Sequence, residues 1–360
     1  MIPSKVLTMN RHRPFRRLLL LALLLTSGGL VPAAQAQDAL EEARAAFRNG
    51  EIDQAITLLV GLTQDPAIDK ETKAEVYTVL GRAYVAKRRA DEAKQAMAKL
   101  LELEPPLIEL DPVRETPQLM RAYYEARYEL CGSYTVDPRC GQDDGPRVKT
   151  LAVADFTNAA TVDHETYDPL RQGIASLLVG QLNAGVDLKV VERERIQWLL
   201  DELELQRNAA VVDQSTAVRV GRLLGATHVI FGTFYVQKRF LSRKMVLQAR
   251  IVDVETGEIL RSESVTGKPG DVYGLAEDLG LKMAQAINVT LANVADDPVR
   301  RFTKSLDAMM AYARGEAFLE RGAYREAREK FLEALSYDPQ FTLARIKADS
   351  VEPMLLASSN

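Results

Sequence analysis

Two kinds of hydrophobic periodicity divide the chain. Residues 38–130 and 303–345 repeat apolar positions three and four apart, a spacing typical of amphipathic helices. The section between them, 146–294, instead contains apolar runs of strand length, in which polar and apolar positions alternate or the apolar run is unbroken. The chain is therefore predicted to hold an α/β domain flanked by all-α helical hairpins.

The order of segments in 146–294 predicts a mixed sheet. Strands are expected at 148–156, 188–193, 227–236, 244–254 and 258–267. Helices are expected at 167–185, 194–206, 215–226 and 271–289. Strand–helix units favour parallel pairing, whereas the last three strands follow one another through short turns and favour an antiparallel meander.

The C-terminal helical section has the spacing of a tetratricopeptide repeat. The positions that carry this spacing are Gly315, Phe318, Ala327, Phe331, Ala334 and Pro339. Small residues at Gly315 and Ala327 allow two antiparallel helices to approach closely, and Phe318 and Phe331 are expected to fill the space between them. Pro339 ends the second helix because a proline cannot continue it.

The N-terminal helical section contains a second copy of the repeat. Tyr84 and Ala93 occupy the corresponding packing positions in the segment 74–105. A weaker copy precedes it, and 116–130 is expected to be a partial repeat or a cap. The alternative is a stack of unrelated helical hairpins.

The first 36 residues have the pattern of a cleaved export signal. Four arginines precede the leucine-rich run 18–25, and Ala34 and Ala36 form a small-x-small cleavage motif. The alternative, a membrane anchor, is disfavoured because the apolar run is shorter than the ~20 residues that span a bilayer. We therefore expect a mature chain that begins near Gln37, lies in the periplasm and associates peripherally with the outer membrane.

Export would place the two cysteines in an oxidising compartment. Cys131 and Cys140 lie in a turn-rich linker, 131–145, and outside the cytoplasm such a pair is predicted to form a disulfide. The alternative is two free thiols. A metal site is disfavoured because no histidine lies nearby to complete a ligand set.

Composition and motifs offer little support for an enzyme. The 46 basic and 50 acidic residues give a formal charge of -4, which does not suggest a nucleic-acid partner. Common nucleophile, phosphate-loop, dinucleotide and zinc-helix motifs are absent from the sequence, so no catalytic residue, cofactor or metal is predicted. Asp163, His164, Glu165 and Asp168 could bind a cation, but Asp168 before Pro169 is more simply a helix start.

A charged stretch precedes the predicted helix at 194–206. Glu192, Arg193, Glu194 and Arg195 are interpreted as solvated charges where the chain enters that helix, rather than as an active site. A helical wheel places Trp198 and Leu205 opposite the apolar face that packs on the sheet. They are predicted either to bind a partner or to be covered by another part of the same chain.

The segments at 149–158, 188–206, 220–234 and 248–260 resemble the CsgG family, the curli secretion components of bacterial outer membranes, and more distantly the TolB amino-terminal and FlgO-type domains. The Val190-Val191-Glu192-Arg193 segment, the segment 224–232 and the turn at 253–258 carry this resemblance. It implies an exported α/β domain that binds envelope partners or assembles with itself.

The chain departs from CsgG in two respects. No cysteine follows the leucine run as an acylation site, and the connection 236–245 is short and rich in lysine and arginine, which disfavours a membrane-spanning hairpin. We therefore expect a non-enzymatic envelope adaptor or assembly protein that serves a secretion or surface-structure complex. Its partners would be envelope proteins or peptides bound by the tetratricopeptide helices, with a possible homo-oligomer through the CsgG-like domain. The alternatives are a CsgG-type transport channel component and, less favoured, a metal-dependent hydrolase.

Overall fold

The computed structural model describes residues 31–66, 68–103, 108–135, 140, 149–183, 185, 188–191, 193–202, 214–239, 242–291 and 302–357. Most of the predicted export signal lies outside these residues. Helix α1 begins at Val31, so the predicted cleavage after Ala36 falls inside it and would remove its first six residues. Within the described part of the chain, no helix combines the length and the apolar character needed to cross a membrane.

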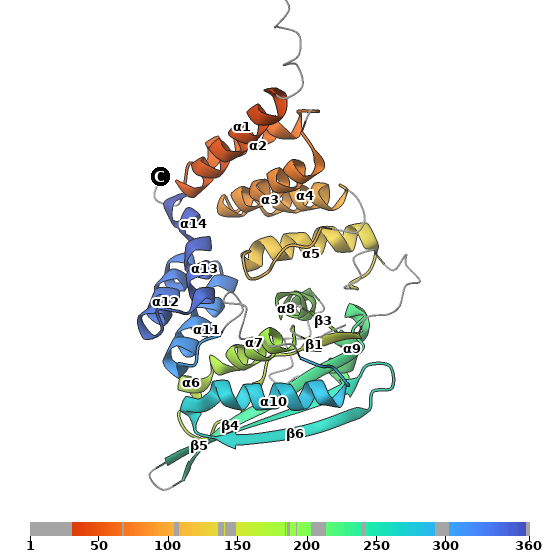
Figure 1. Cartoon of the computed structure of the whole chain (residues 1–360), viewed down its shortest axis with the longest axis vertical. Helices are drawn as coiled ribbons and strands as arrows, with labels where there is room; N and C mark the ends of the chain where they lie inside the picture. Colours follow the sequence, from red (N-terminus) through yellow and green to blue (C-terminus); the bar gives the residue numbers. More distant parts are fainter. Residues whose placement is uncertain are drawn as a thin grey trace, which may run out of the picture.

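Five helices form the N-terminal part. They are α1 (Val31–Arg48), α2 (Ile52–Thr63), α3 (Lys70–Ala86), α4 (Ala90–Leu101) and α5 (Pro117–Cys131). They stack as successive layers in Figure 1. Asp69 caps α3 by accepting a 2.7 Å hydrogen bond from the Thr72 amide. Gly81 lets α3 and α4 approach closely, because a Cβ there would lie 2.6 Å from the Cε atom of Met97.

The middle part is a mixed six-stranded sheet. Its strands are β1 (Lys149–Val153), β2 (Thr157–Asn158), β3 (Leu188–Val191), β4 (His228–Arg239), β5 (Ser242–Asp253) and β6 (Ile259–Gly267). The order is β3-β1-β4-β5-β6, with β2 also paired to β4. β1 is parallel to β3 and β4, whereas β4, β5 and β6 are antiparallel neighbours. The predicted combination of parallel pairing and a meander is confirmed.

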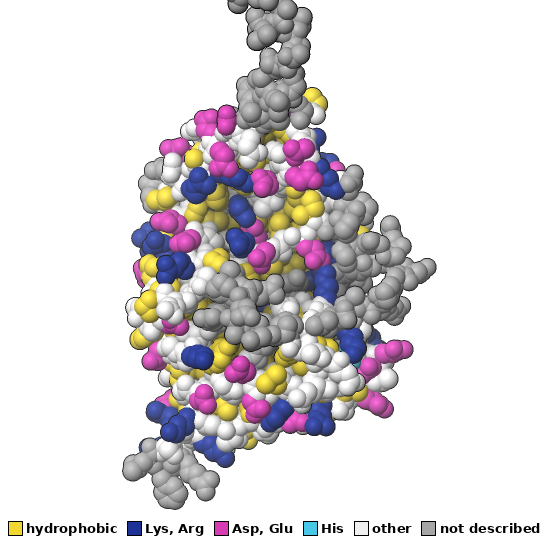
Figure 2. Space-filling view, in the orientation of Figure 1, with side chains coloured by type: hydrophobic (Ala, Val, Ile, Leu, Met, Phe, Trp, Pro, Cys, Tyr) yellow, Lys and Arg dark blue, Asp and Glu magenta, His cyan; other side chains and the backbone are white. Residues whose placement is uncertain are grey.

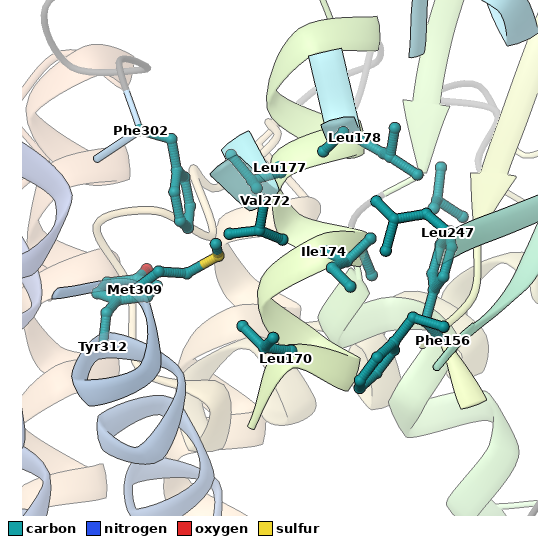
Figure 3. Close-up of a cluster of buried hydrophobic side chains, with 14 of the residues drawn as sticks. Phe156, Leu170, Ile174, Leu177, Leu178, Leu247, Val272, Phe302, Met309 and Tyr312 are labelled. Atoms are coloured by element: carbon teal, nitrogen blue, oxygen red, sulfur yellow. The ribbon is translucent and has the colours of Figure 1, made fainter. Parts of the chain in front are cut away.

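Helices cover the sheet on both faces. They are α6 (His164–Tyr167), α7 (Leu170–Leu182), α8 (Arg193–Glu202), α9 (Gln214–Leu224) and α10 (Val272–Ala286), with the short 3-10 turn η2 (Pro269–Asp271) before α10. The α7 and α10 side buries an apolar cluster that includes Phe156, Ile174 and Leu247 (Figure 3). On the other side, α8 and α9 pack on the sheet, and α5 packs on α8.

The C-terminal helices pack against the N-terminal ones. Helices α11 (Leu306–Glu320), α12 (Tyr324–Tyr337), α13 (Thr342–Ser350) and α14 (Glu352–Ala357) run along one side of the molecule from the level of α7 to α1 (Figure 1). Met309 and Tyr312 of α11 face α7, which joins the C-terminal helices to the apolar cluster (Figure 3). The segment after residue 345 is thus helical and ends against the N-terminal helices.

Candidate functional site

A groove of about 800 Å³ lies between the N-terminal helices and the C-terminal ones. We define the groove by the residues that line it from four places. They are Glu41, Arg44, Phe47 and Arg48 on α1; Ala74, Glu75, Thr78, Val79 and Arg82 on α3; Ile108, Arg114, Glu115 and Thr116 before α5; and Ile346, Asp349, Ser350, Pro353 and Met354 on α13 and α14. α1 and α3 are the first helices of successive hairpins, and stacked hairpins of this kind present concave surfaces.

The groove carries four arginines and four acidic residues, so its formal charge balances. Arg82 makes a two-point ion pair with Glu115, with nitrogen–oxygen distances of 2.8 and 2.5 Å. Burial acts to lower the pKa of Arg82, but the hydrogen bond and the charge of Glu115 outweigh it and raise the pKa above its ordinary value. This pair forms the floor of the groove because Glu115 is only 4% exposed.

Other groove charges remain available to a ligand. Arg44 binds Glu75 at 2.5 Å and also contacts Glu41. Arg48 and Asp349 are exposed on opposite walls, and neither forms an ion pair with another described residue. Charged and apolar side chains intermingle on the upper half of the face shown in Figure 2. A groove of this composition suits a peptide segment better than a single small ion.

The C-terminal wall is held by buried contacts. Lys347 is 2% exposed and donates hydrogen bonds to the carbonyl oxygens of Pro112, at 2.9 Å, and Glu115, at 3.3 Å. Met354 is 4% exposed and joins the core of the N-terminal helices. Gly50, at φ +77°, passes so close to α14 that a Cβ there would lie 2.5 Å from the Cβ of Leu356. The wall is therefore a built part of the groove.

These wall residues were missed from the sequence. The segment 343–354 places Leu343, Lys347, Val351 and Met354 at helical spacing, which would have indicated a buried face of a helix. Lys347 belongs to the buried face because two backbone carbonyls satisfy its ammonium group. The sequence shows the helical spacing, but it does not show that the carbonyl oxygens of Pro112 and Glu115 accept hydrogen bonds from Lys347.

Of the two alternatives for Trp198, binding a partner or being covered by another part of the same chain, the structure shows the second. Its side chain is 5% exposed and lies between the rings of Tyr124 and Tyr134, at centroid distances of 5.7 and 5.4 Å. Helix α5, through Tyr124, and the segment after it, through Tyr134, cover Trp198. Leu205, the second predicted partner residue, lies outside the described residues.

The interpretation of Arg193 and Arg195 as solvated charges is wrong. Arg193 is 5% exposed and binds Glu320 at the end of α11, with Asp155 3.7 Å away. Arg195 is 4% exposed and donates to the carbonyl oxygens of Tyr134, at 3.0 Å, and Thr135. The two arginines therefore join α8 to the C-terminal helices and to the segment after α5. Glu192 lies outside the described residues.

The predicted disulfide is present. Cys131 and Cys140 are bonded, nine positions apart, beside the stacked rings of Tyr128 and Tyr134. The bond secures the segment that covers Trp198. In this way it contributes to the joint between the N-terminal helices and the sheet.

The predicted repeat-packing residues lie in the two helical hairpins. In the C-terminal hairpin Gly315 meets Phe331, whose ring would be 2.5 Å from a Cβ at 315, and Ala327 is fully buried. Phe318 is partly buried, with Arg321 over its ring at 5.4 Å.

In the N-terminal hairpin Ala93 is fully buried, and Tyr84 is half-buried with Arg89 4.8 Å above its ring.

The possible cation cluster is dispersed. Asp163 binds Arg243 at 2.6 Å, and Asp168 accepts a weak hydrogen bond from Asn158 at 3.4 Å. Among the described residues, no three histidine, cysteine or acidic side chains gather as a metal site would require. Asp168 ends α6 and does not cap α7 through its side chain, so its predicted role as a helix start is also corrected.

Two family models match parts of the chain. Residues 145–236 match the family model of the curli production assembly/transport component CsgG, and residues 74–106 match a tetratricopeptide repeat. No curated protein matches the sequence.

Three solved structures align with part of the chain. The LpoB C-terminal domain from Salmonella enterica is 21% identical, covers 35% of this chain and 87% of its own, and has a TM-score of 0.26. The LpoB C-terminal domain from Escherichia coli is 16% identical, with coverages of 44% and 99% and a TM-score of 0.25. The lipoprotein GNA1162 from Neisseria meningitidis is 15% identical, with coverages of 38% and 99% and a TM-score of 0.27. The two family matches confirm the resemblance read from the motifs: the chain carries a CsgG-like segment preceded by a tetratricopeptide repeat.

Proposed function

We propose that this chain is a non-enzymatic adaptor of the cell envelope that binds a segment of a partner protein in the groove. The single observation that carries the proposal is the groove itself. The stacked N-terminal helices form one wall, and helices α13 and α14 form the other. The CsgG and tetratricopeptide matches support a role in envelope protein interaction. Periplasmic location after export, and peripheral association with the outer membrane, are part of this proposal.

The groove offers a partner segment two kinds of contact. Phe47, Val79 and Met354 provide apolar surface, although each is largely buried by its neighbours. Arg48 and Asp349 provide charges of opposite sign on facing walls. A segment with an acidic and a basic residue flanking apolar ones would match this pattern, because complementary charges fix the register of a bound segment.

The sheet and its joint have a positioning role in this proposal. Arg193 and Trp198 hold α8 against α5 and α11, so the groove and the CsgG-like sheet would move as one body. An adaptor needs such a connection if it presents a bound partner to a larger secretion or surface-structure complex. That the larger assembly is a secretion or surface-structure complex is part of the proposal.

Affinity capture from the envelope tests the proposal with a matched pair of variants. Arg48→Glu with Asp349→Lys reverses the two unpaired groove charges at no net change. Lys99→Glu with Asp278→Lys is the control on the outer faces of α4 and α10, where both side chains are more than half exposed and each forms a surface ion pair with a residue three or four positions away. Loss of partner capture in the groove variant alone supports the groove, and equal capture by both variants contradicts it.

A further inference from the structure

The strand β6 forms one edge of the sheet. It pairs with β5 on one side, and no described strand pairs with its other side. Most of its nine residues are exposed, including Ile259 at 40% and Leu260 at 43%. An edge of this length presents unpaired backbone N–H and C=O groups, which are a template for another strand.

The charges on β6 are arranged symmetrically about Ser262. Arg261 and Glu263 stand on either side of it, and their side chains form an ion pair at 2.7 Å. Arg261 is 61% exposed and Glu263 19% exposed, so the pair can be reached from outside. Because side chains alternate between faces, both charges project from the same face of the strand.

This pattern is self-complementary in one register. If two copies of β6 pair antiparallel with Ser262 opposite Ser262, Arg261 of each copy lies opposite Glu263 of the other. A shift of the centre to Arg261 or to Glu263 places like charges opposite each other, which is destabilising across strands. The described sequence of the strand therefore favours one two-fold arrangement over its neighbours.

We propose that β6 pairs antiparallel with β6 of a second copy of this chain, about a two-fold axis at Ser262. The two sheets become one continuous sheet, and two arginines and two glutamates alternate across its centre. The interface is isologous, as two-fold interfaces require.

This inference specifies the homo-oligomer expected of the CsgG-like domain and does not depend on the groove. The groove lies at the other end of the molecule from β6 (Figure 1). A failure of self-association therefore leaves the groove proposal standing, and a failure of partner capture leaves the two-fold pairing standing.

Cysteine cross-linking of the purified full chain tests the register. Ser262→Cys places two thiols opposite each other, where Cβ atoms lie about 4.5–5.5 Å apart and small adjustments permit a disulfide. Ser264→Cys is the matched control, because its thiol lies opposite position 260 of the other copy and about 13 Å along the strand from its equivalent. Both serines are exposed, so both variants are expected to fold.

We expect a covalent dimer from Ser262→Cys under oxidising conditions and little or none from Ser264→Cys. Equal cross-linking of both variants, or no cross-linking of either, would overturn the proposal. Analytical ultracentrifugation of the unmodified chain is the accompanying measurement, and a monomer at the highest concentration reached would also overturn it.

Charge reversal provides an independent check. Arg261→Glu alone opposes two glutamates in each half of the interface, and Glu263→Arg alone opposes two arginines. We expect each to weaken the dimer by about tenfold or more. The double variant with both reversals restores opposite charges and should recover the original dissociation constant within about threefold. Equal weakening by the single and double variants would contradict the register.

Discussion

The two helical sections, whose sequences have similar repeat spacing, are packed in different ways. In the C-terminal hairpin, Tyr312, Phe331 and Phe341 fill the interior, and Met309 continues the packing onto α7. In the N-terminal section, the corresponding concave side keeps arginines and carboxylates around an open groove. The C-terminal hairpin therefore acts as a structural brace, because aromatic rings fill the space between its helices and against α13.

The brace also completes the groove. α13 and α14 extend the C-terminal hairpin to α1, where Lys347 and Met354 form part of the wall. Stability of the C-terminal helices rests on buried rings, whereas binding in the groove would rest on exposed charges from both of its walls, so different substitutions separate the two. The following changes test that separation, from the largest expected effect to the smallest.

Phe331→Ala should have the largest effect. Phe331 is fully buried between α11 and α12, and removing its ring leaves a cavity that costs roughly 3–5 kcal/mol of unfolding free energy. Urea denaturation followed by circular dichroism measures it. Leu332→Ala is the control, because Leu332 is 43% exposed and should lose less than about 1 kcal/mol. Similar losses for both would mean that the C-terminal hairpin is not a packed brace.

Arg193→Met tests the link between the sheet and the brace. The change leaves Glu320 and Asp155 without their common cation, and we expect a loss of roughly 2–3 kcal/mol, below the range for fully buried pairs because Glu320 is partly exposed. Arg193→Met with Glu320→Gln should lose less than the sum of the two single variants. Additive losses in this double-mutant cycle would show that the two residues are not coupled.

Replacing Cys131 and Cys140 with alanine should cost about 2–3 kcal/mol, since the bond closes a short loop and restricts the unfolded chain. Tryptophan fluorescence provides a second readout, because Trp198 is the only tryptophan and the covering segment contains Tyr134. A red shift of its emission in the folded protein is expected. An unchanged unfolding free energy and an unchanged emission spectrum would show that the disulfide does not secure the segment that covers Trp198.

The groove charges should have the smallest effect on stability. Arg48→Glu with Asp349→Lys changes exposed side chains that form no ion pair with other described residues, so unfolding free energy should shift by less than about 0.5 kcal/mol. Thermal unfolding checks this result. A large destabilisation would mean that these residues hold the wall together, and partner capture by this variant would lose its meaning as a test of binding.

Much of the fold could be predicted because its signals are local. The spacing of Gly315, Ala327 and Phe331 predicted the C-terminal hairpin, and alternation in 244–254 predicted a strand of the meander. Both depend on contacts between neighbouring segments. The nearby cysteines, in the same way, predicted their own bond.

The joint at α8 and the wall of the groove could not be predicted, because their residues contact partners that are distant in the sequence. Arg193 and Trp198 resembled a solvated charge and an outward ring on the wheel of α8, because Glu320 lies 127 positions away and Tyr124 on a different helix. Lys347 is buried by carbonyls more than 230 positions away. A helical wheel shows which side chains share a face, but it does not show whether a second layer covers the other face.

Site-specific photocrosslinking tests the central claim most directly. A photoreactive phenylalanine analogue at Thr78, on the groove side of α3, is compared with the same analogue at Lys99, exposed on α4. In the living envelope, the account predicts a defined cross-link to a partner protein from position 78 and none of the same mass from position 99. The same product from both positions, or from position 99 alone, would contradict a partner segment bound in the groove.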